Sequence, residues 1–135
     1  MTNPQGNLSA AQYEIIEAVW EYREKGATVA EIWEAISRGR GVARTTVLNL
    51  VSRLEKRGWL VRREDEKPVR YLAALDRERT AVLLTDGFVE DFFGGSARQL
   101  VMSLLGSKRL RPDDIERLQR ELNSASKKRD TRRDA

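Results

Sequence analysis

The sequence predicts a mainly α-helical fold with a small β-sheet, and three observations predict it. Between Val42 and Gly58, apolar residues recur at helical spacing opposite a polar, basic face, and a glycine-bearing turn precedes them. Two short runs of strand-forming residues joined by a charged turn follow directly. The C-terminal third carries three further helical patterns with broad apolar faces. Together these patterns predict a winged helix-turn-helix head (8–75), a helical dimerisation element (76–123) and flexible tails (1–7 and 124–135).

Two capping boxes mark the starts of the first two helices. The first box begins at Ser9 and opens a helix that we expect over about 9–25. The second begins at Thr28 and opens a helix to about residue 37, with Trp33 on its inward face. The glycine-bearing turn comes next, so these elements have the order of a helix-turn-helix motif.

The helix after this turn, from Val42 or Ala43 to Arg57, has two different faces. The opposite side from its apolar face carries short hydrogen-bonding side chains and cations, unlike the alternating Glu and Lys of an ordinary solvated helix. Gly58 ends the helix in the position that a C-terminal cap prefers. Four apolar residues at i, i+3, i+4 and i+7 form the buried face: Val47, Leu50, Val51 and Leu54.

A hairpin is expected after this helix. Residues 59–61 and 69–72 are rich in strand formers, and 27–29 could add a very short third strand. Pro68 lies at the edge of the second run, where a missing N–H is tolerated. The alternative is a plain surface β-ribbon. Acidic residues at 64–66 argue against close contact between the hairpin tip and phosphate.

Positive charge is concentrated on this part of the chain. Residues 37–63 include eight basic residues and one acidic residue, whereas residues 8–36 include two basic and six acidic ones. The whole chain has a net charge of only +4, so the location of the charge is more informative than its size. A basic helix and hairpin are what binding to the phosphates of double-stranded DNA requires.

The composition also limits other chemistry. The chain has no cysteine and no histidine, which excludes disulfides, thiolate catalysis, Cys/His metal sites and imidazole acid–base chemistry. We therefore expect no catalytic residue, no metal and no cofactor. No apolar run reaches the length of a membrane span, and the N-terminus lacks the pattern of a signal peptide, so we expect a cytoplasmic protein without a membrane partner.

Side-chain chemistry assigns roles within the basic region. A recognition helix meets base edges with its first two turns, which predicts base readout by Arg44, Thr45, Thr46 and Asn49. Arginine pairs with guanine, asparagine with adenine, and threonine contacts phosphates or thymine methyls. The alternative is a solvated face whose threonines favour the helix start. We expect phosphate contacts from the other cations: Arg53, Lys56, Arg62, Arg63, Lys67 and Arg70.

The C-terminal third has more apolar surface than a small head needs. Helices are expected from about Asp76 to Phe93, after Ser96, and from Pro112. Their apolar faces could fold back on the head or pack against a second copy, and we expect the second copy. An isologous homodimer would place two heads one helical turn apart on a palindromic site. The predicted dimerisation residues are Leu84, Phe88, Phe92, Leu100, Val101, Leu104, Leu105, Ile115, Leu118 and Leu122.

Two other function classes compete with DNA binding. The winged helix could instead be a protein-interaction module whose basic helix contacts an acidic partner, without specific DNA readout. An enzyme is the weakest hypothesis. The adjacent Asp113 and Asp114 could suggest acid–base work, but at a helix start they are far better explained as partners of the helix dipole.

Five segments carry a family resemblance between Leu8 and about Asn123. They are LSAAQYEIIEAVWE, TVAEIWEAI, ARTTVLNLVSRLEKRGWL, VRYLAAL and DFFGGSARQLVMSLL. With these segments, the chain resembles the penicillinase repressors, a family that includes the β-lactamase, methicillin-resistance and copper-responsive repressors. The resemblance implies a homodimeric winged-helix repressor, without enzymatic activity, on a palindromic operator upstream of its own regulon.

The sequence departs from the two switches known in such families. In β-lactam-responsive members a sensor protease cuts an Asn-Phe bond in the second C-terminal helix, and Ser103-Leu104 occupies the corresponding position here. In copper-responsive members a C-terminal cysteine cluster binds the metal, and this chain has no cysteine. The resemblance therefore leaves the releasing signal unassigned.

Overall fold

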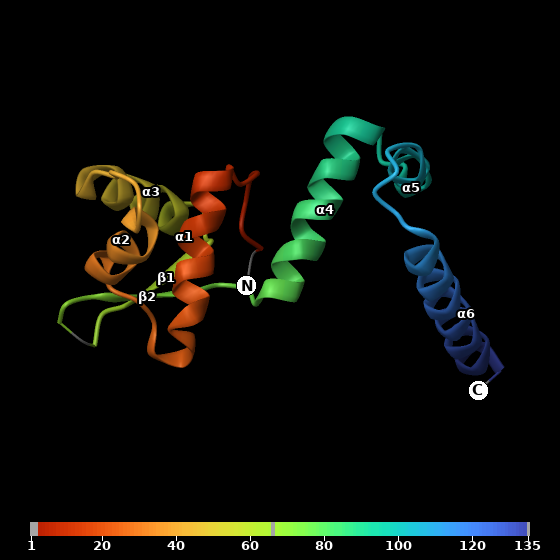
Figure 1. The fold of residues 1–135 in the computed structure, drawn as a ribbon. Coiled ribbons are helices and arrows are strands. Elements are labelled where there is room, and N and C mark those ends of the chain that lie inside the picture. Colours follow the sequence, from red (N-terminus) through yellow and green to blue (C-terminus); the bar gives the residue numbers. More distant parts are fainter. Residues whose placement is uncertain (1–2, 66, 135) are drawn as a thin grey trace. The chain divides into compact units, whose positions relative to one another are not determined.

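Helices and strands follow one another in the predicted order (Figure 1). The computed structural model describes residues 3–65 and 67–134. It divides into an N-terminal unit, Met1–Phe88, and a C-terminal unit, Val89–Ala135. The elements are α1 (Ala10–Glu21), a 3-10 turn (Arg23–Lys25), α2 (Val29–Ser37), α3 (Arg44–Lys56), β1 (Leu60–Arg63), β2 (Arg70–Ala73), α4 (Arg77–Phe93), α5 (Ala97–Gly106) and α6 (Pro112–Asp134).

Both predicted capping boxes are confirmed. The Ser9 hydroxyl accepts from the backbone N–H of Gln12, and the Gln12 side chain accepts from the backbone N–H of Ser9. Thr28 and Glu31 make the same reciprocal pair at the start of α2. Each box satisfies two N–H groups that a helix start would otherwise leave without a partner.

The core of the N-terminal unit lies between the three helices and the hairpin. The three helices α1, α2 and α3 contact one another, and α3 also packs on β1. The predicted apolar face of α3 is buried except for Leu50, which is half-buried. Side chains from every one of these elements meet in the core: Ile15, Ile16, Val19, Ile32, Val47, Val51, Leu54, Trp59, Leu60 and Tyr71.

The predicted hairpin is confirmed as an antiparallel pair in which Leu60 lies opposite Ala73. The expected third strand is reduced to a single bridge, because only Ala27 pairs with Tyr71 through two backbone hydrogen bonds of 2.9 and 2.8 Å. Three helices followed by this hairpin form a winged helix-turn-helix, with the hairpin as the wing.

Residues 3–7 do not form the loose tail that the sequence predicted for this segment. Pro4 is buried, and the backbone of Gln5 makes two contacts with the segment after α3. Its N–H donates to the carbonyl of Arg57 (3.0 Å), and its carbonyl accepts from the indole N–H of Trp59 (3.1 Å). The Arg57 guanidinium donates to the carbonyl of Asn7 (2.9 Å). The segment is therefore held to the end of α3, and the lost chain entropy is offset by these contacts.

The C-terminal unit contains the end of α4 together with α5 and α6. Ser96 caps α5 by accepting from the backbone N–H of Gln99, as predicted. Helix α6 begins at Pro112 and continues to Asp134, where the sequence predicted an unstructured tail from residue 124. Charged residues with good helix propensity can extend a helix that has no apolar face. The tail was predicted from its lack of large apolar residues, and that lack does not exclude such a helix. Residues 1, 2, 66 and 135, parts of the predicted tails and hairpin tip, lie outside the described residues.

Within residues 3–65 and 67–134, no helix combines the length and the apolar character that crossing a membrane would require.

Gly26 tests how the wing is attached to the helices. Its backbone has φ 79° and ψ 172°, and a Cβ atom there would lie 2.8 Å from the carbonyl oxygen of Tyr71. Gly26→Ala should therefore lower the free energy of unfolding by about 1–3 kcal/mol, measured by urea denaturation. Gly39→Ala is the matched control, because Gly39 has φ +74° but a Cβ atom there would meet nothing within 4 Å. Equal losses in the two variants would contradict a steric role for Gly26.

Candidate nucleic-acid interface

The outer face of α3 presents the residues predicted to read bases. Thr45, Thr46 and Asn49 are exposed, and Ser52 continues the same surface. Beneath them, Val47, Val51 and Leu54 are fully buried, so the helix is held by its opposite face. An exposed row of short hydrogen-bonding side chains on a rigidly packed helix can approach base edges without first breaking internal contacts.

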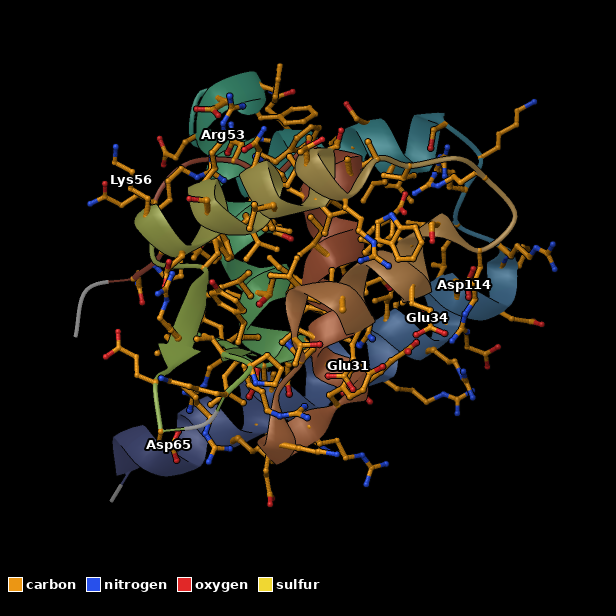
Figure 2. All side chains as sticks on the ribbon, turned by 90° about the vertical axis from the view of Figure 1, so that its left-hand side faces the viewer. Glu31, Glu34, Arg53, Lys56, Asp65 and Asp114 are labelled. Carbon is orange, nitrogen blue, oxygen red and sulfur yellow. The ribbon has the colours of Figure 1, made fainter. Side chains whose placement is uncertain are left out.

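Two cations extend this surface toward the end of α3. Arg53 and Lys56 are exposed and project outward from the helix (Figure 2). They lie in the last turn of α3, where positive charge is also favourable to the helix dipole. Exposed cations at the end of a helix are the kind of side chain that contacts phosphate groups.

Arg44, the first residue of α3, is held against a tryptophan. Its guanidinium carbon lies 4.5 Å from the centre of the Trp33 ring, a cation–π distance. The Trp33 indole N–H donates to the carbonyl of Val42 (2.7 Å), just before α3 begins. The sequence placed Trp33 in the core, whereas the structure leaves it half-buried between α2 and the start of α3.

Arg62 on β1 is engaged within the N-terminal unit. It donates to both carboxylate oxygens of Glu55 (3.0 and 3.3 Å) and to the hydroxyl of Tyr71 (3.3 Å). These interactions, led by the hydrogen bond to Glu55, raise the pKa of Arg62 above its ordinary value. The ion pair connects the last turn of α3 to the wing.

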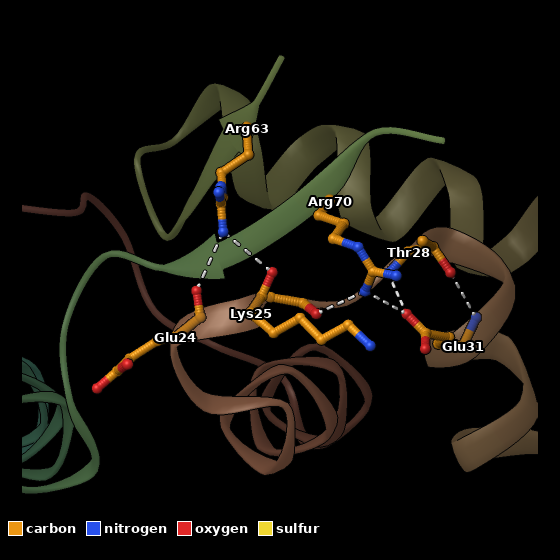
Figure 3. A network of polar contacts seen from close by, with 7 residues as sticks. Glu24, Lys25, Thr28, Glu31, Arg63 and Arg70 are labelled. Carbon is orange, nitrogen blue, oxygen red and sulfur yellow. Dashed lines mark hydrogen bonds and ion pairs between the residues drawn. The ribbon is translucent and has the colours of Figure 1, made fainter. Parts of the chain in front are cut away.

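The other two strand arginines connect the wing to the turn between α1 and α2 (Figure 3). Arg63 donates to the carbonyls of Glu24 (3.2 Å) and Lys25 (3.4 Å). Arg70 donates to the carbonyl of Gly26 (3.1 Å) and to the carboxylate of Glu31 (3.0 Å). Both residues were predicted as phosphate contacts. The geometry shows guanidinium groups that also satisfy backbone carbonyls, and sequence reasoning had no signal for these partners.

The pKa values of two carboxylates beside these arginines are lowered. The pKa of Glu31 is held below its ordinary value, chiefly because the backbone N–H of Thr28 donates to it, with further help from the Thr28 hydroxyl and Arg70 against the opposing effect of desolvation. The pKa of Asp65 is lowered mainly by its hydrogen bond from Arg63 (3.2 Å). Glu31 therefore serves both the capping box of α2 and the attachment of the wing.

Lys67 is exposed in the connection between the two strands. The turn before α3 contains two further arginines, Arg38 and Arg40, which were not among the predicted DNA-contact residues. Arg40 forms an ion pair with Glu14 and donates to the carbonyl of Ile36 (3.2 Å), whereas Arg38 is exposed. Arg38 could have been added to the predicted DNA-contact residues, because it is a basic residue in the glycine-bearing turn between two helices.

The predicted dimerisation residues fall into three groups. Leu84 packs against the core of the N-terminal unit, and this contact partly accounts for its apolar character. Leu100 and Leu104 are half-buried, and Ser103 beside Leu104 is exposed within α5. The remaining residues are exposed by about a third or more: Phe88, Phe92, Val101, Leu105, Ile115, Leu118 and Leu122.

In the part of the chain that the structure describes, no group of three or more Asp and Glu side chains is placed to hold a metal ion.

A helix-turn-helix whose second helix is polar and basic outside, followed by an anchored hairpin, defines a winged-helix DNA-binding protein. The chain belongs to the penicillinase repressor family, whose family model matches residues 8–124. It is thus a DNA-binding transcriptional repressor.

Curated relatives align over nearly the whole chain. The methicillin resistance regulatory protein MecI of Mammaliicoccus sciuri is 27% identical, with 91% of this chain and 98% of the relative covered. The penicillinase repressor of Staphylococcus aureus is 26% identical, with 95% and 100% covered. The transcriptional regulator BlaI of Mycobacterium tuberculosis (strain H37Rv) is 28% identical, with 87% and 81% covered. A solved MarR family protein from Bacillus stearothermophilus is 21% identical, with 90% of this chain and 74% of that chain covered and a TM-score of 0.46.

The Glu31–Arg70 pair predicts a pH-dependent stability. Because the folded-state pKa of Glu31 lies below its ordinary value of 4.5, its contribution is present above that pH and is lost as the pH falls through the folded pKa. Glu31→Gln keeps an acceptor for Thr28 but removes the ion pair. The free energy of unfolding should therefore fall less steeply for this variant than for the wild type between about pH 5 and 3. Glu34→Gln, at an exposed glutamate of the same helix, is the control and should follow the wild-type curve. Parallel curves for all three proteins would contradict the assignment.

Proposed function

We propose that this repressor acts as a homodimer on a two-fold symmetric operator, with one α3 helix in the major groove of each half-site. The observation that carries the proposal is the outer face of α3, where Thr45, Thr46 and Asn49 are exposed. On the opposite face Val47, Val51 and Leu54 are fully buried. A helix supported in this way presents a fixed pattern of donors and acceptors to base edges.

Base readout is assigned to the first two turns of α3. Arg44 would pair with the O6 and N7 acceptors of guanine, and Asn49 with the N6 and N7 groups of adenine. Thr45 and Thr46 have a hydroxyl for a phosphate or a base and a methyl group for thymine. All four side chains are exposed, which supports this assignment.

Phosphate contact is assigned to the cations that project from the surface, namely Arg53, Lys56 and Lys67. Arg62, Arg63 and Arg70 are assigned a different first duty, because each already binds groups within the N-terminal unit. They hold the wing in place and add positive potential beside the DNA, and any phosphate contact of theirs would be shared with these partners.

Dimerisation is assigned to the apolar side chains of the C-terminal unit. Phe92 is 69% exposed and Leu122 is 68% exposed, and Val101, Leu105 and Leu118 add to the exposed apolar surface. Exposed apolar surface of this kind is buried at low cost by a second copy, and the family resemblance implies a homodimer. Acting on DNA in this way would place the protein in the cytoplasm and would need no catalytic residue.

Binding to the promoter next to its own gene tests this function. At ordinary salt, that promoter should bind much more tightly than a shuffled fragment of the same composition, measured by fluorescence anisotropy. Arg44→Ala should remove roughly 1–3 kcal/mol of this preference per half-site. Lys56→Gln should weaken both fragments alike and reduce the slope of log K against log salt by about 2 for a dimer, because each lost phosphate contact accounts for about 0.9.

Equal binding of the two fragments would rule out specific repression. If DNA binding were absent and an acidic protein were retained instead, the protein-interaction hypothesis would replace this one. A double charge reversal, Arg53→Glu with Lys56→Glu, should abolish retention on both DNA and heparin.

The dimer is tested at Phe92. Phe92→Asp should raise the dimer dissociation constant by roughly 100-fold, because dimerisation would desolvate an unpaired carboxylate in each copy. Sedimentation velocity at micromolar concentration provides the measurement. Val61→Asp is the control, since Val61 is an apolar residue of β1 that is 51% exposed but lies outside the predicted interface. A wild-type protein that sediments as a monomer would remove the basis for palindromic binding.

A further inference from the structure

We propose that Trp33 is a positioning residue for DNA readout, because it holds the side chain of Arg44 in the orientation that reaches the DNA. This inference rests on the proposed role of Arg44 in base readout. Trp33 itself comes from α2 and is half-buried, so it contributes to readout through its contact with Arg44.

The backbone before α3 is tied to α2. Ala43 occupies the N-cap position, and no side chain caps this end of the helix. The indole N–H of Trp33 donates to the carbonyl of Val42 at 2.7 Å, which ties the incoming chain to α2. The tie fixes the direction in which the first residue of α3 leaves the turn, and that residue is Arg44.

The Arg44 guanidinium lies over the Trp33 ring. Its carbon lies 4.5 Å from the centre of the Trp33 ring. Contact with the ring face leaves the in-plane N–H donors of a guanidinium directed away from the ring, so it can still bind a guanine through two hydrogen bonds. A free arginine side chain loses rotamer entropy when it is ordered at an interface, and an arginine already held on the ring loses less.

The same arrangement occurs again at Trp20 and Arg77. The indole N–H of Trp20 donates to the carbonyl of Leu75 (3.0 Å), and the Arg77 guanidinium carbon lies 4.7 Å from the Trp20 ring centre. Here too the arginine is the first residue of a helix and follows the accepting carbonyl by two positions.

The two arrangements differ in what else binds the arginine. Arg77 also forms an ion pair with Glu17 at 3.4 Å. Arg44 forms no ion pair within residues 3–65 and 67–134, so its donors are not committed to a carboxylate there. The Trp20 arrangement is therefore suited to stabilising the start of α4, and the Trp33 arrangement to presenting a cation.

A double-mutant cycle tests the inference. The quantity measured is the discrimination ratio, the dissociation constant for the shuffled fragment divided by that for the promoter. Trp33→Leu should lower this ratio about fivefold in the wild-type background, and should not lower it further when Arg44 is already alanine. A loss of folded protein would weaken both fragments in proportion and leave the ratio unchanged, so the ratio separates positioning from stability.

Two further variants complete the design. Trp33→Phe keeps a smaller aromatic face and loses the N–H, so it should lower the ratio only about twofold, again only when Arg44 is present. Trp33→Phe also serves as the test variant if Trp33→Leu does not fold. Trp20→Leu is the matched control, which should reduce stability and leave the ratio at the wild-type value.

The outcomes separate this inference from the proposed function. If Arg44→Ala leaves the ratio unchanged, the assignment of Arg44 to base readout fails, and this inference fails with it. If Arg44→Ala lowers the ratio but the Trp33 variants lower it equally in both backgrounds, the proposed function stands and the positioning role is overturned.

Discussion

The proposed recognition surface depends on the burial of one face of α3. Val47, Val51 and Leu54 have no exposed surface, and they pack among side chains from α1, α2 and the hairpin. Because close-packed interiors resist displacement, the outward direction of Thr45, Thr46 and Asn49 is set by the side chains on the other side of the helix. The proposed DNA readout and the stability of the core would therefore depend on the same helix, and a change that loosens the buried face would also disturb the exposed one.

Some arginine side chains bind groups within the N-terminal unit and others extend into solvent. The exposed fraction of a side chain does not tell the two kinds apart. Arg62, Arg63 and Arg70 hold the wing through a carboxylate, a hydroxyl or backbone carbonyls. A planar guanidinium with five donors can satisfy several such groups at once, but the carboxylates bound to Arg62, Arg63 and Arg70 offset part of their charge. Part of the positive charge that the sequence concentrates in this region therefore builds the structure. Arg53 and Lys56 extend that region outward from α3.

The C-terminal unit differs from the N-terminal one in what its apolar residues contact. In the N-terminal unit, apolar faces from separate elements cover one another and leave a closed core. In the C-terminal unit, Phe92, Val101 and Leu122 remain more than half exposed. Apolar periodicity correctly located the helices, because it depends on spacing within each helix. Periodicity does not show what the apolar face of a helix packs against. Leu84 is an example, because it was predicted as a dimerisation residue and packs on the core of the N-terminal unit.

The sequence by itself determined the features that depend on near neighbours. The capping boxes, the end of α3 just before Gly58 and the apolar face of α3 all arise from residues within about one or two turns of each other. Only the tertiary structure decided the partners of the long cations. Arg63 and Arg70 reach carbonyls 39 and 44 positions away, and Arg44 lies on a ring from the preceding helix. A long, flexible side chain can reach many groups, so its partner is chosen by how distant segments pack together, which no local pattern encodes.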